Sequence, residues 1–296
     1  MSENVLRLSK RRVRNKPRIN RSLGGNIVIF TFITLLGLFM ALPLVYAVGN
    51  AFKPLEELWV FPPPLFPQNP TLKNFKDLMY LLQDSWVPIS RYFFNTVFIT
   101  VCATAGQVVF ASMCAYAIAK RKAPGMKFMF SVIVLALMFS SSVTAIPNYI
   151  TMVRLHMLDT YWALIIPAIG SPLGLYLMKQ FMETSVPDTL LEAARIDGAN
   201  ELVIFFRMVM LLVKPAWLTL IVFTVQAQWN MGASVFIYTE QLKTLPYAIS
   251  QIIAGGIARA GVGSAVTVVM MLVPILVFLF SQSNIVKTMS TSGMKE

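Results

Sequence analysis

The side chains that most often carry covalent or metal chemistry are rare in this sequence. It contains one histidine, His156, and two cysteines, Cys102 and Cys114, and its scattered carboxylates show no metal-ligand spacing. The cysteines lie in one apolar stretch, where twelve residues of helix would place them about 18 Å apart, beyond disulfide reach. No Gly-Lys pair occurs, so the phosphate-binding loop of P-loop ATPases is absent. These features predict a chain that performs no covalent chemistry, with no catalytic residue and no metal site.

A cluster of amides beside an indole offers binding chemistry instead. Gln226, Gln228, Trp229 and Asn230 interrupt a segment that is otherwise apolar enough for lipid. Amides and aromatic faces suit an uncharged, hydroxyl-rich solute such as a sugar better than charged groups do. Gln226 and Asn230 are four residues apart, so on a helix they share a face with Phe223. We interpret these five residues as candidates for a substrate pathway; the alternative is that they join helices by hydrogen bonds.

The segment that carries this cluster is one of several predicted membrane helices. Of the 296 residues, 56% are apolar and 13% charged, and the mean hydropathy is +0.67, which excludes an ordinary water-soluble domain and intrinsic disorder. Six apolar windows are long enough to cross the roughly 30 Å hydrocarbon core of a bilayer. They cover residues 26–49, 93–119, 128–150, 161–180, 215–237 and 263–282. None has an Asp, Glu, Lys, Arg or His in its interior, which disfavours a carrier driven by protons or sodium.

Lysine and arginine are distributed unevenly between the two sides of these windows. The first 25 residues hold eight of the 25 basic residues, and the whole chain carries a net charge of +12. Counted on alternate sides, 18 basic residues lie on the side of both termini and seven on the other, so the positive-inside rule predicts that both termini are cytoplasmic. We therefore divide the chain into a basic cytoplasmic tail at 1–25 and a six-span domain at 26–296, with the segment 51–92 outside.

The basic tail and the first window have alternative interpretations. The tail could bind nucleic acid, but an anionic membrane surface suits it better because a long apolar segment follows at once, so we expect no nucleic acid partner. The first window could be a signal peptide. Its apolar run from Ile27 to Val48 is too long for that, and it is predicted to be an uncleaved first span.

A polar insertion between the fourth and fifth windows is the most informative part of the sequence. Within the cytoplasmic segment 182–214, Ala193 and Ala194 are compact residues that favour a helix. Asp197 and Gly198 then form a turn signal, and helical periodicity resumes beyond it. The pattern predicts a short helix, a sharp bend and a second helix that leads back into the membrane.

This insertion closely resembles the EAA motif of permease subunits of ATP-binding-cassette (ABC) importers. The residues at the family's spacing are Glu192, Ala193, Ala194, Asp197, Gly198, Ala199, Phe205 and Pro215. The segments 115–125 and 159–181, and Trp229-Asn230, are similar to permeases of carbohydrate importers, particularly the smaller six-helix subunit of the maltose-transporter type. The chain departs from the family pattern at Leu211, where relatives place a proline, and at Met231, where they place an acidic residue.

The resemblance implies an all-α integral membrane protein, the six-helix transmembrane domain of a type I ABC importer. It further implies a coupling helix at about 187–200 that docks on an ATPase subunit. The coupling residues would be Glu192, Ala193, Ala194, Asp197, Gly198, Ala199 and Phe205. The external segment 239–261, with Gly255 and Gly256, would contact a binding protein outside the membrane.

The implied function is import of a carbohydrate, in particular an oligosaccharide, across a bacterial or archaeal plasma (inner) membrane. The implied partners are a second permease subunit in a heterodimer, two ATPase subunits that bind ATP and Mg²⁺, and an extracytoplasmic sugar-binding protein. No cofactor is expected in this chain, which is not an enzyme. Two alternatives remain: a permease for another solute such as a polyol or glycerol-phosphate, and a membrane anchor or sensor that transports nothing. An anchor would not need a docking segment of the EAA type.

Overall fold

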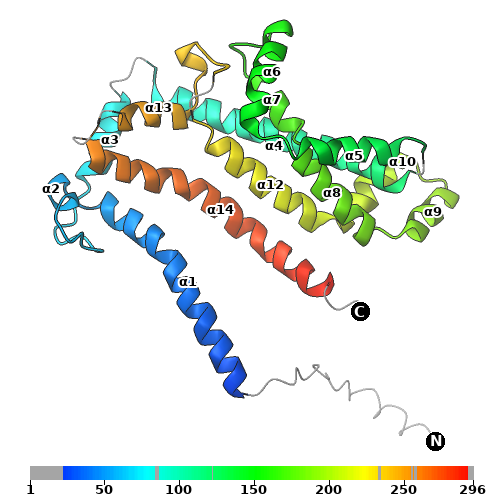
Figure 1. Cartoon of the computed structure of the whole chain (residues 1–296), viewed down its shortest axis with the longest axis horizontal. Helices are drawn as coiled ribbons and strands as arrows, with labels where there is room; N and C mark the ends of the chain where they lie inside the picture. The colour runs from blue at the N-terminus through cyan, green and yellow to red at the C-terminus, as the bar shows by residue number, and fades with distance from the viewer. Residues whose placement is uncertain are drawn as a thin grey trace, which may run out of the picture. The chain divides into compact units, whose positions relative to one another are not determined.

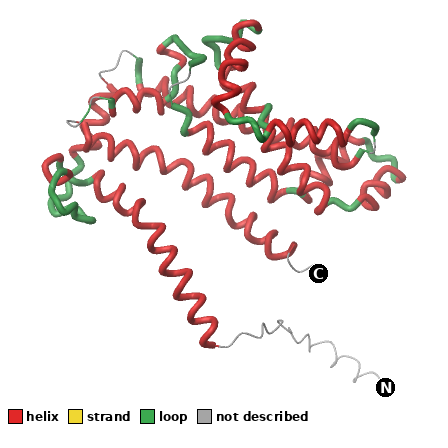
Figure 2. Tube along the Cα trace, in the orientation of Figure 1, coloured by secondary structure: helices red, strands yellow, loops and turns green. Residues whose placement is uncertain are grey.

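The long helix α4 is the element around which several others pack in this computed structural model, which describes residues 23–83, 87–121, 123–232, 235–254, 256 and 259–292 (Figure 1). Helices α7, α8 and α12 lie against α4, and α14 lies against α12. Throughout these described ranges the regular structure is helical (Figure 2). The elements are α1 (Leu23–Ala51), α2 (Leu55–Leu58), α3 (Lys73–Gln83), α4 (Ile89–Lys120), α5 (Met126–Ala136), α6 (Ser141–Arg154), α7 (Trp162–Ile169), α8 (Pro172–Ser185), α9 (Asp188–Ile196), α10 (Glu201–Ile204), the π-helix η1 (Phe205–Val209), α11 (Met210–Leu212), α12 (Lys214–Trp229), the 3₁₀-helix η2 (Glu240–Leu242), α13 (Leu245–Ile253) and α14 (Ala260–Ser292).

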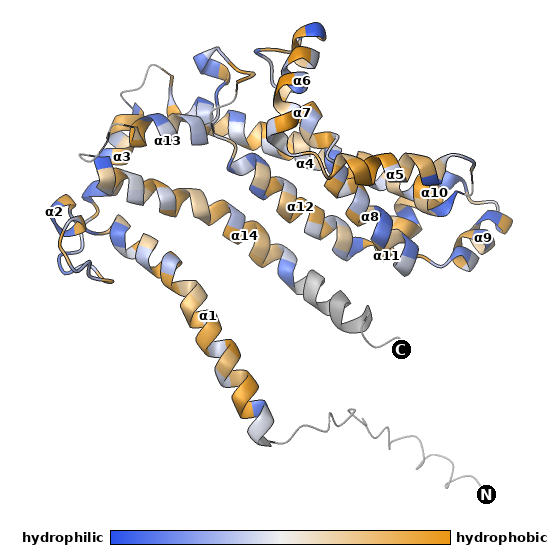
Figure 3. Cartoon of the chain, viewed as in Figure 1, coloured by the Kyte–Doolittle hydropathy of each residue, from blue (hydrophilic) through white to orange (hydrophobic). Residues whose placement is uncertain are grey.

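Helix α1 has the character of a helix that faces lipid. The chain separates into two compact units, 1–46 and 47–296, and α1 supplies the described part of the first. Its best apolar window has a mean hydropathy of 2.5 and no buried residue, and Figure 3 colours the helix as largely hydrophobic. A helix that is apolar on all sides and 28 residues long can cross a bilayer with some tilt.

Four of the six predicted windows correspond to helical stretches long and apolar enough to cross a membrane, one of which consists of α7 and α8. Within the described residues, the helices long and apolar enough to cross a membrane are those at 24–51, 89–120, 162–185 and 260–282. A fifth span is obtained if the pair Glu201–Leu212 and Lys214–Trp229 counts as one, although the two parts are bent by 80°. The predicted window 215–237 was too long at its end, because α12 stops at Trp229.

The predicted window 128–150 is divided between two shorter helices. Helix α5 has 11 residues and α6 has 14, and four residues separate them. Pro147 lies inside α6 and does not coincide with the break. The break instead falls at Ser140, where the backbone is extended; serine competes for backbone hydrogen bonds and favours helix starts.

Small residues let the central helices approach closely. Ala103, Ala111 and Ala115 of α4 are buried against its neighbours. At Gly106 an added Cβ would lie 2.5 Å from the side chain of Ile169, and at Gly174 of α8 it would lie 2.6 Å from that of Gln107. Because lipid offers no hydrophobic drive between spans, such close van der Waals packing is a principal source of helix association.

Candidate functional site

A short helix is present where one was predicted at about 187–200, namely α9. It begins after Pro187, carries Asp188 in its first turn and Arg195 in its last, an order that suits the helix dipole. Leu191 is 1% exposed and packs into the chain's own core, whereas Ile196 is 86% exposed. The helix therefore has one face packed against the rest of this chain and one exposed face.

The two alanines of the motif lie on different faces of α9. Ala194 is buried in the same core as Leu191, whereas Ala193 is exposed, as is Glu192. Ala194, one of the residues expected to act in coupling, therefore lies against its own chain rather than on the exposed face of α9. Its small side chain instead lets α9 lie close to the rest of its own chain.

Gly198 turns the chain at the end of α9, as the sequence predicted. Its φ is +79°, in the left-handed region that glycine adopts without steric cost. The amide of Ala199 donates to the carbonyl of Ala194, and that of Gly198 donates to the carbonyl of Arg195, both at 3.0 Å. This pair of bonds is the Schellman arrangement that ends a helix sharply. Asp197, the C-cap, is exposed beside it.

Three side chains connect α9 to α4. Arg195 Nε donates to Glu201 Oε1 at 2.8 Å, and the hydroxyl of Tyr116 in α4 donates to Glu201 Oε2, also at 2.8 Å. The guanidinium of Arg195 holds the pKa of Glu201 below its usual range, and the Tyr116 hydroxyl acts in the same direction. We call this set, Arg195, Glu201 and Tyr116, the α9–α4 network.

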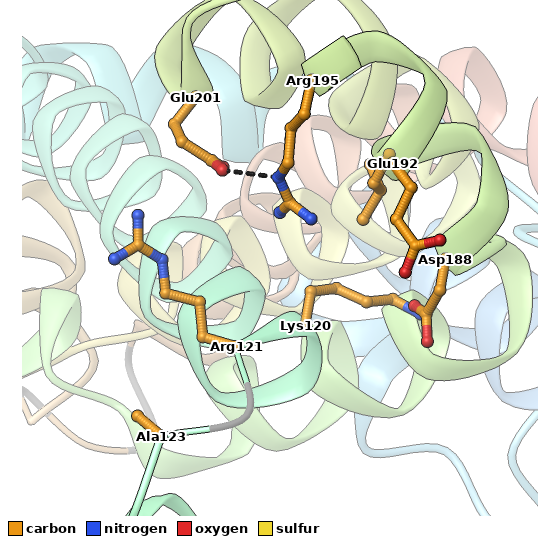
Figure 4. A pocket seen from close by; sticks show the side chains of 8 residues that line it. Lys120, Arg121, Ala123, Asp188, Glu192, Arg195 and Glu201 are labelled. Atoms are coloured by element: carbon orange, nitrogen blue, oxygen red, sulfur yellow. Dashed lines mark hydrogen bonds and ion pairs between the residues drawn. The ribbon is translucent and has the colours of Figure 1, made fainter.

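A second contact holds the start of α9 to the end of α4. Lys120 Nζ donates to the carbonyl of Val186 at 2.6 Å and to Asp188 Oδ1 at 2.9 Å. Together the two contacts border an open charged cleft of about 450 Å³ (Figure 4). Its lining residues are Lys120, Arg121, Ala123, Asp188, Leu191, Glu192, Arg195 and Glu201.

The segment after the bend includes a π-helix, η1, between α10 and α11. Asn200 caps α10 by accepting a hydrogen bond from the amide of Leu202. Phe205 is buried, and its ring centroid lies 5.6 Å from that of Tyr116. The neighbouring Phe206, by contrast, is half exposed. A π-helix within α-helical surroundings often marks a functional segment.

The predicted pathway residues of α12 are divided between two faces. Phe223, Gln226 and Asn230 are exposed on one face, and the Asn230 side chain donates to the carbonyl of Gln226 at 2.9 Å. Gln228 and Trp229 are buried on the other, where Trp229 Nε1 donates to the carbonyl of Met270 at 2.9 Å. Trp229 therefore joins α12 to α14 by a hydrogen bond, as in the alternative we considered for the cluster, whereas Gln228 is buried with its Oε1 unpartnered among the described residues.

Further polar side chains are buried between α4 and α12. Thr224 of α12 donates to Gln107 of α4, and the hydroxyls of Thr100 and Thr104 and the Oε1 atom of Gln228 have no hydrogen-bond partner in the described chain. The sequence analysis did not predict this polar contact, because the windows that form it are largely apolar. Gln107, a polar residue within the second window, was the available indication.

The predicted binding-protein loop is only partly described. Gly255 lies outside the described residues, and Gly256 has a φ of +79°. Nearby, Asp159 accepts hydrogen bonds from the amides of Tyr238 and Thr239 at 3.0 and 2.8 Å. Hydrogen bonds from Thr239, its hydroxyl first, hold the pKa of Asp159 below its usual range. This carboxylate fixes the segment after α12 to the turn between α6 and α7.

Sequence reasoning did not identify the partners that hold α9 in place. Tyr116, Lys120 and Glu201 were passed over because they lie at the ends of apolar or motif segments. A phenol and a lysine at the end of an apolar window, near a motif rich in charges, were the available signal. The residues that act between elements become visible only when those elements are placed together.

Known proteins with similar sequences cover most of the chain, although no protein-family model matches it. It is 31% identical over 210 residues to Protein LplC of Bacillus subtilis (strain 168), which covers 71% of this chain and 68% of that protein. It is 28% identical over 279 residues to the polygalacturonan/rhamnogalacturonan transport system permease protein YtcP of the same organism, covering 88% and 95%. The sn-glycerol-3-phosphate transport system permease protein UgpE of Pectobacterium atrosepticum is 30% identical over 261 residues, covering 86% and 92%.

A solved structure has the same fold. It is the crystal structure of a bacterial ABC transporter involved in the import of the acidic polysaccharide alginate, and the match covers 89% of this chain and 98% of the other. The TM-score is 0.73 at 23% sequence identity. This likeness confirms the predicted fold class, an all-α integral membrane domain of the ABC importer type.

Proposed function

Because this chain belongs to the permease proteins of ABC transporters, we propose that it is the membrane-spanning subunit of an ATP-driven, binding-protein-dependent importer that translocates a carbohydrate. The observation that carries the carbohydrate assignment is the relative named for polygalacturonan and rhamnogalacturonan transport, which aligns over 95% of its length. The exposed amides and aromatic ring of α12 support the same assignment, since they can bind hydroxyl groups without a charge.

The coupling segment receives the motion of an ATPase subunit through α9. The outward side chains Glu192, Ala193 and Ile196 would make the contact, and Glu192 is available to a basic partner. The α9–α4 network and the Lys120 contacts then transmit the displacement to α4, because they fix both ends of α9 to that helix. ATP-driven closure would thereby switch the permease between inward- and outward-facing states.

The substrate pathway is proposed for the exposed face of α12, now reduced to Phe223, Gln226 and Asn230. A second permease subunit would face these side chains and complete the pathway in a heterodimer. Two ATPase subunits would supply ATP and Mg²⁺, and a sugar-binding protein would deliver the solute from outside, with both termini of this chain in the cytoplasm of a bacterial or archaeal cell. The charge count between the two sides of the spans supports this orientation.

A second candidate solute is glycerol-phosphate, because one relative of 30% identity is named for its transport. A phosphate group is bound best by arginine, lysine or helix N-termini. The stretch from Pro215 to Asn230 has no charged residue, which favours an uncharged sugar at this face.

Uptake by a deletion strain tests the proposal. The strain is supplied with single radiolabelled oligosaccharides, or with glycerol-3-phosphate, and the gene is restored on a plasmid. We expect restored uptake of one class of oligosaccharide. Restored uptake of glycerol-3-phosphate alone would replace the carbohydrate assignment, and unchanged uptake of every solute would favour the anchor or sensor.

A further inference from the structure

Two charged side chains of the loop between α1 and α3, Lys53 and Glu57, are buried, whereas Glu56 is exposed. Lys53 is 1% exposed, and its amine donates to Asn50 Oδ1 at 2.7 Å and to the carbonyl of Pro64. Glu57 is 8% exposed and accepts hydrogen bonds from the amides of Gln68 at 2.7 Å and Asn69 at 3.3 Å. Both side chains therefore form hydrogen bonds with backbone groups of the loop that surrounds them.

The same loop presents apolar side chains on its outside. Within residues 59–67, which we call the proline loop, the sequence WVFPPPLFP contains no charged residue. Its large side chains are exposed: Trp59, Val60, Phe61, Leu65 and Phe66, with Phe61 at 93%. This distribution is the reverse of that in a loop surrounded by water, where charges point outward and apolar groups pack inward.

The backbone of the proline loop also suits a poorly hydrated environment. Four of its nine residues are prolines and have no N–H group that needs an acceptor. The carbonyl of Pro64 is satisfied by Lys53, and Asn74 of α3 donates to the carbonyls of Ala51 and Lys53 at 3.0 and 2.7 Å. The free-energy cost of moving a loop out of water is small when its polar groups already have hydrogen-bond partners within the protein.

The position of the loop in the chain places it beside a membrane surface. Helix α1, which is long and apolar enough to span a bilayer, ends at Ala51, eight residues before Trp59. Tryptophan and other aromatic residues are enriched where a bilayer meets water, because their rings prefer the region of the lipid headgroups.

We propose that the proline loop is a membrane anchor, inserted into the lipid interface next to the end of α1. Trp59, Phe61 and Phe66 contact the region between headgroups and acyl chains, while Lys53 and Glu57 hold the loop in the shape that exposes them. Lipid fits this surface better than a protein partner does, because the surface offers no charge that would specify a protein and continues directly from a spanning helix.

The test measures the depth of a spin label in the reconstituted transporter. Cysteine replaces Phe61, or as a matched control Gln68, in a chain whose Cys102 and Cys114 are replaced by alanine. Gln68 is an exposed polar residue that directly follows the proline loop. The labelled complexes are placed in nanodiscs of phosphatidylcholine and phosphatidylglycerol, and collisions with oxygen and with a water-soluble nickel chelate are measured.

We expect the label at position 61 to collide several times more with oxygen than with the nickel chelate, and the label at position 68 to show the reverse. Equal nickel access at both positions would overturn the proposal. Protection at 61 that persists in detergent, or that requires the binding protein, would assign the surface to a protein contact and would equally overturn it. Binding-protein-stimulated ATP hydrolysis by the same samples reports separately on the transporter's function.

Discussion

The coupling segment and the exposed face of α12 use polar side chains in opposite ways. In the coupling segment, Glu201 of α10 accepts hydrogen bonds from Arg195 of α9 and from Tyr116 of α4, so three helices are joined. On α12, the amide of Asn230 reaches only the carbonyl of Gln226 one turn earlier. Polar groups that are already paired can hold helices in place, whereas groups without a partner element are available to a solute or another subunit. The contrast agrees with the roles proposed above, in which the coupling segment transmits force and the exposed face of α12 meets the solute.

The largest effect is expected from a β-branched residue at Gly198. An added Cβ would meet no atom within 4 Å, so the damage comes from the left-handed backbone alone, about 1–3 kcal/mol of strain. Gly198→Val should abolish sugar uptake and weaken co-purification of the ATPase, with membrane levels near normal because the spans insert independently of this turn. Quantitative immunoblots and uptake assays measure both.

Gly198→Asn is the matched control for that substitution, because asparagine tolerates the left-handed region far better than valine. It should retain most of the uptake. If Val and Asn behave alike, strain at this turn does not explain the effect, and the coupling role assigned to the bend is wrong.

Reversal of charge at Glu192 tests the outer face of α9 without altering its fold. Glu192 is exposed and takes part in none of the described side-chain hydrogen bonds of the coupling segment, so Glu192→Lys should leave stability within about 0.5 kcal/mol. We expect strongly reduced uptake and reduced ATPase binding. Wild-type hydrolysis stimulated by the binding protein in this variant would remove Glu192 from the contact.

The exposed and buried glutamines of α12 provide the next comparison. Gln226→Leu and Asn230→Leu each remove a group that could bind a passing hydroxyl, worth roughly 0.5–1.5 kcal/mol, or at most about tenfold in uptake. Gln228→Leu is the matched control on the same helix, because its side chain is buried and its Oε1 has no partner among the described residues. We expect lower uptake for the first two and near-normal uptake for the third; the opposite order would move the pathway to the buried face.

The smallest expected effect is a pH-dependent change in stability at Asp159, which lies neither in the coupling segment nor on α12. The pKa of Asp159 is lowered in the folded chain, so its contribution to stability is present above its unfolded pKa of about 3.9 and is lost as pH falls through the lower folded value. Asp159→Asn should therefore lower the melting temperature of the purified transporter slightly at pH 7, and the difference should disappear in strong acid. A difference that persists in strong acid would show that the charge is not responsible.

The fold class and the coupling turn were predictable because their signals are local. A long run of apolar residues predicts a membrane span, and the pair Asp197 and Gly198 predicts a bend. Which side of α9 would be buried was not predictable, because Ala193 and Ala194 are both small and only the position of α4 distinguishes them. Which face of α12 is buried was not predictable for the same reason. The indole of Trp229 donates to a carbonyl on another helix, and the sequence does not indicate which helix that is.

The close approach at Gly174 restricts how this subunit can move. A methyl group at this position would collide with Gln107 of α4 at 2.6 Å and crowd Leu220 of α12 at 3.0 Å, so three helices meet there with no room for one to slide past another. We expect α4, α8 and α12 to travel as a single block during each cycle. The movement that transport requires would then occur elsewhere, at the 80° bend before Lys214 and at the contact with the proposed second permease subunit.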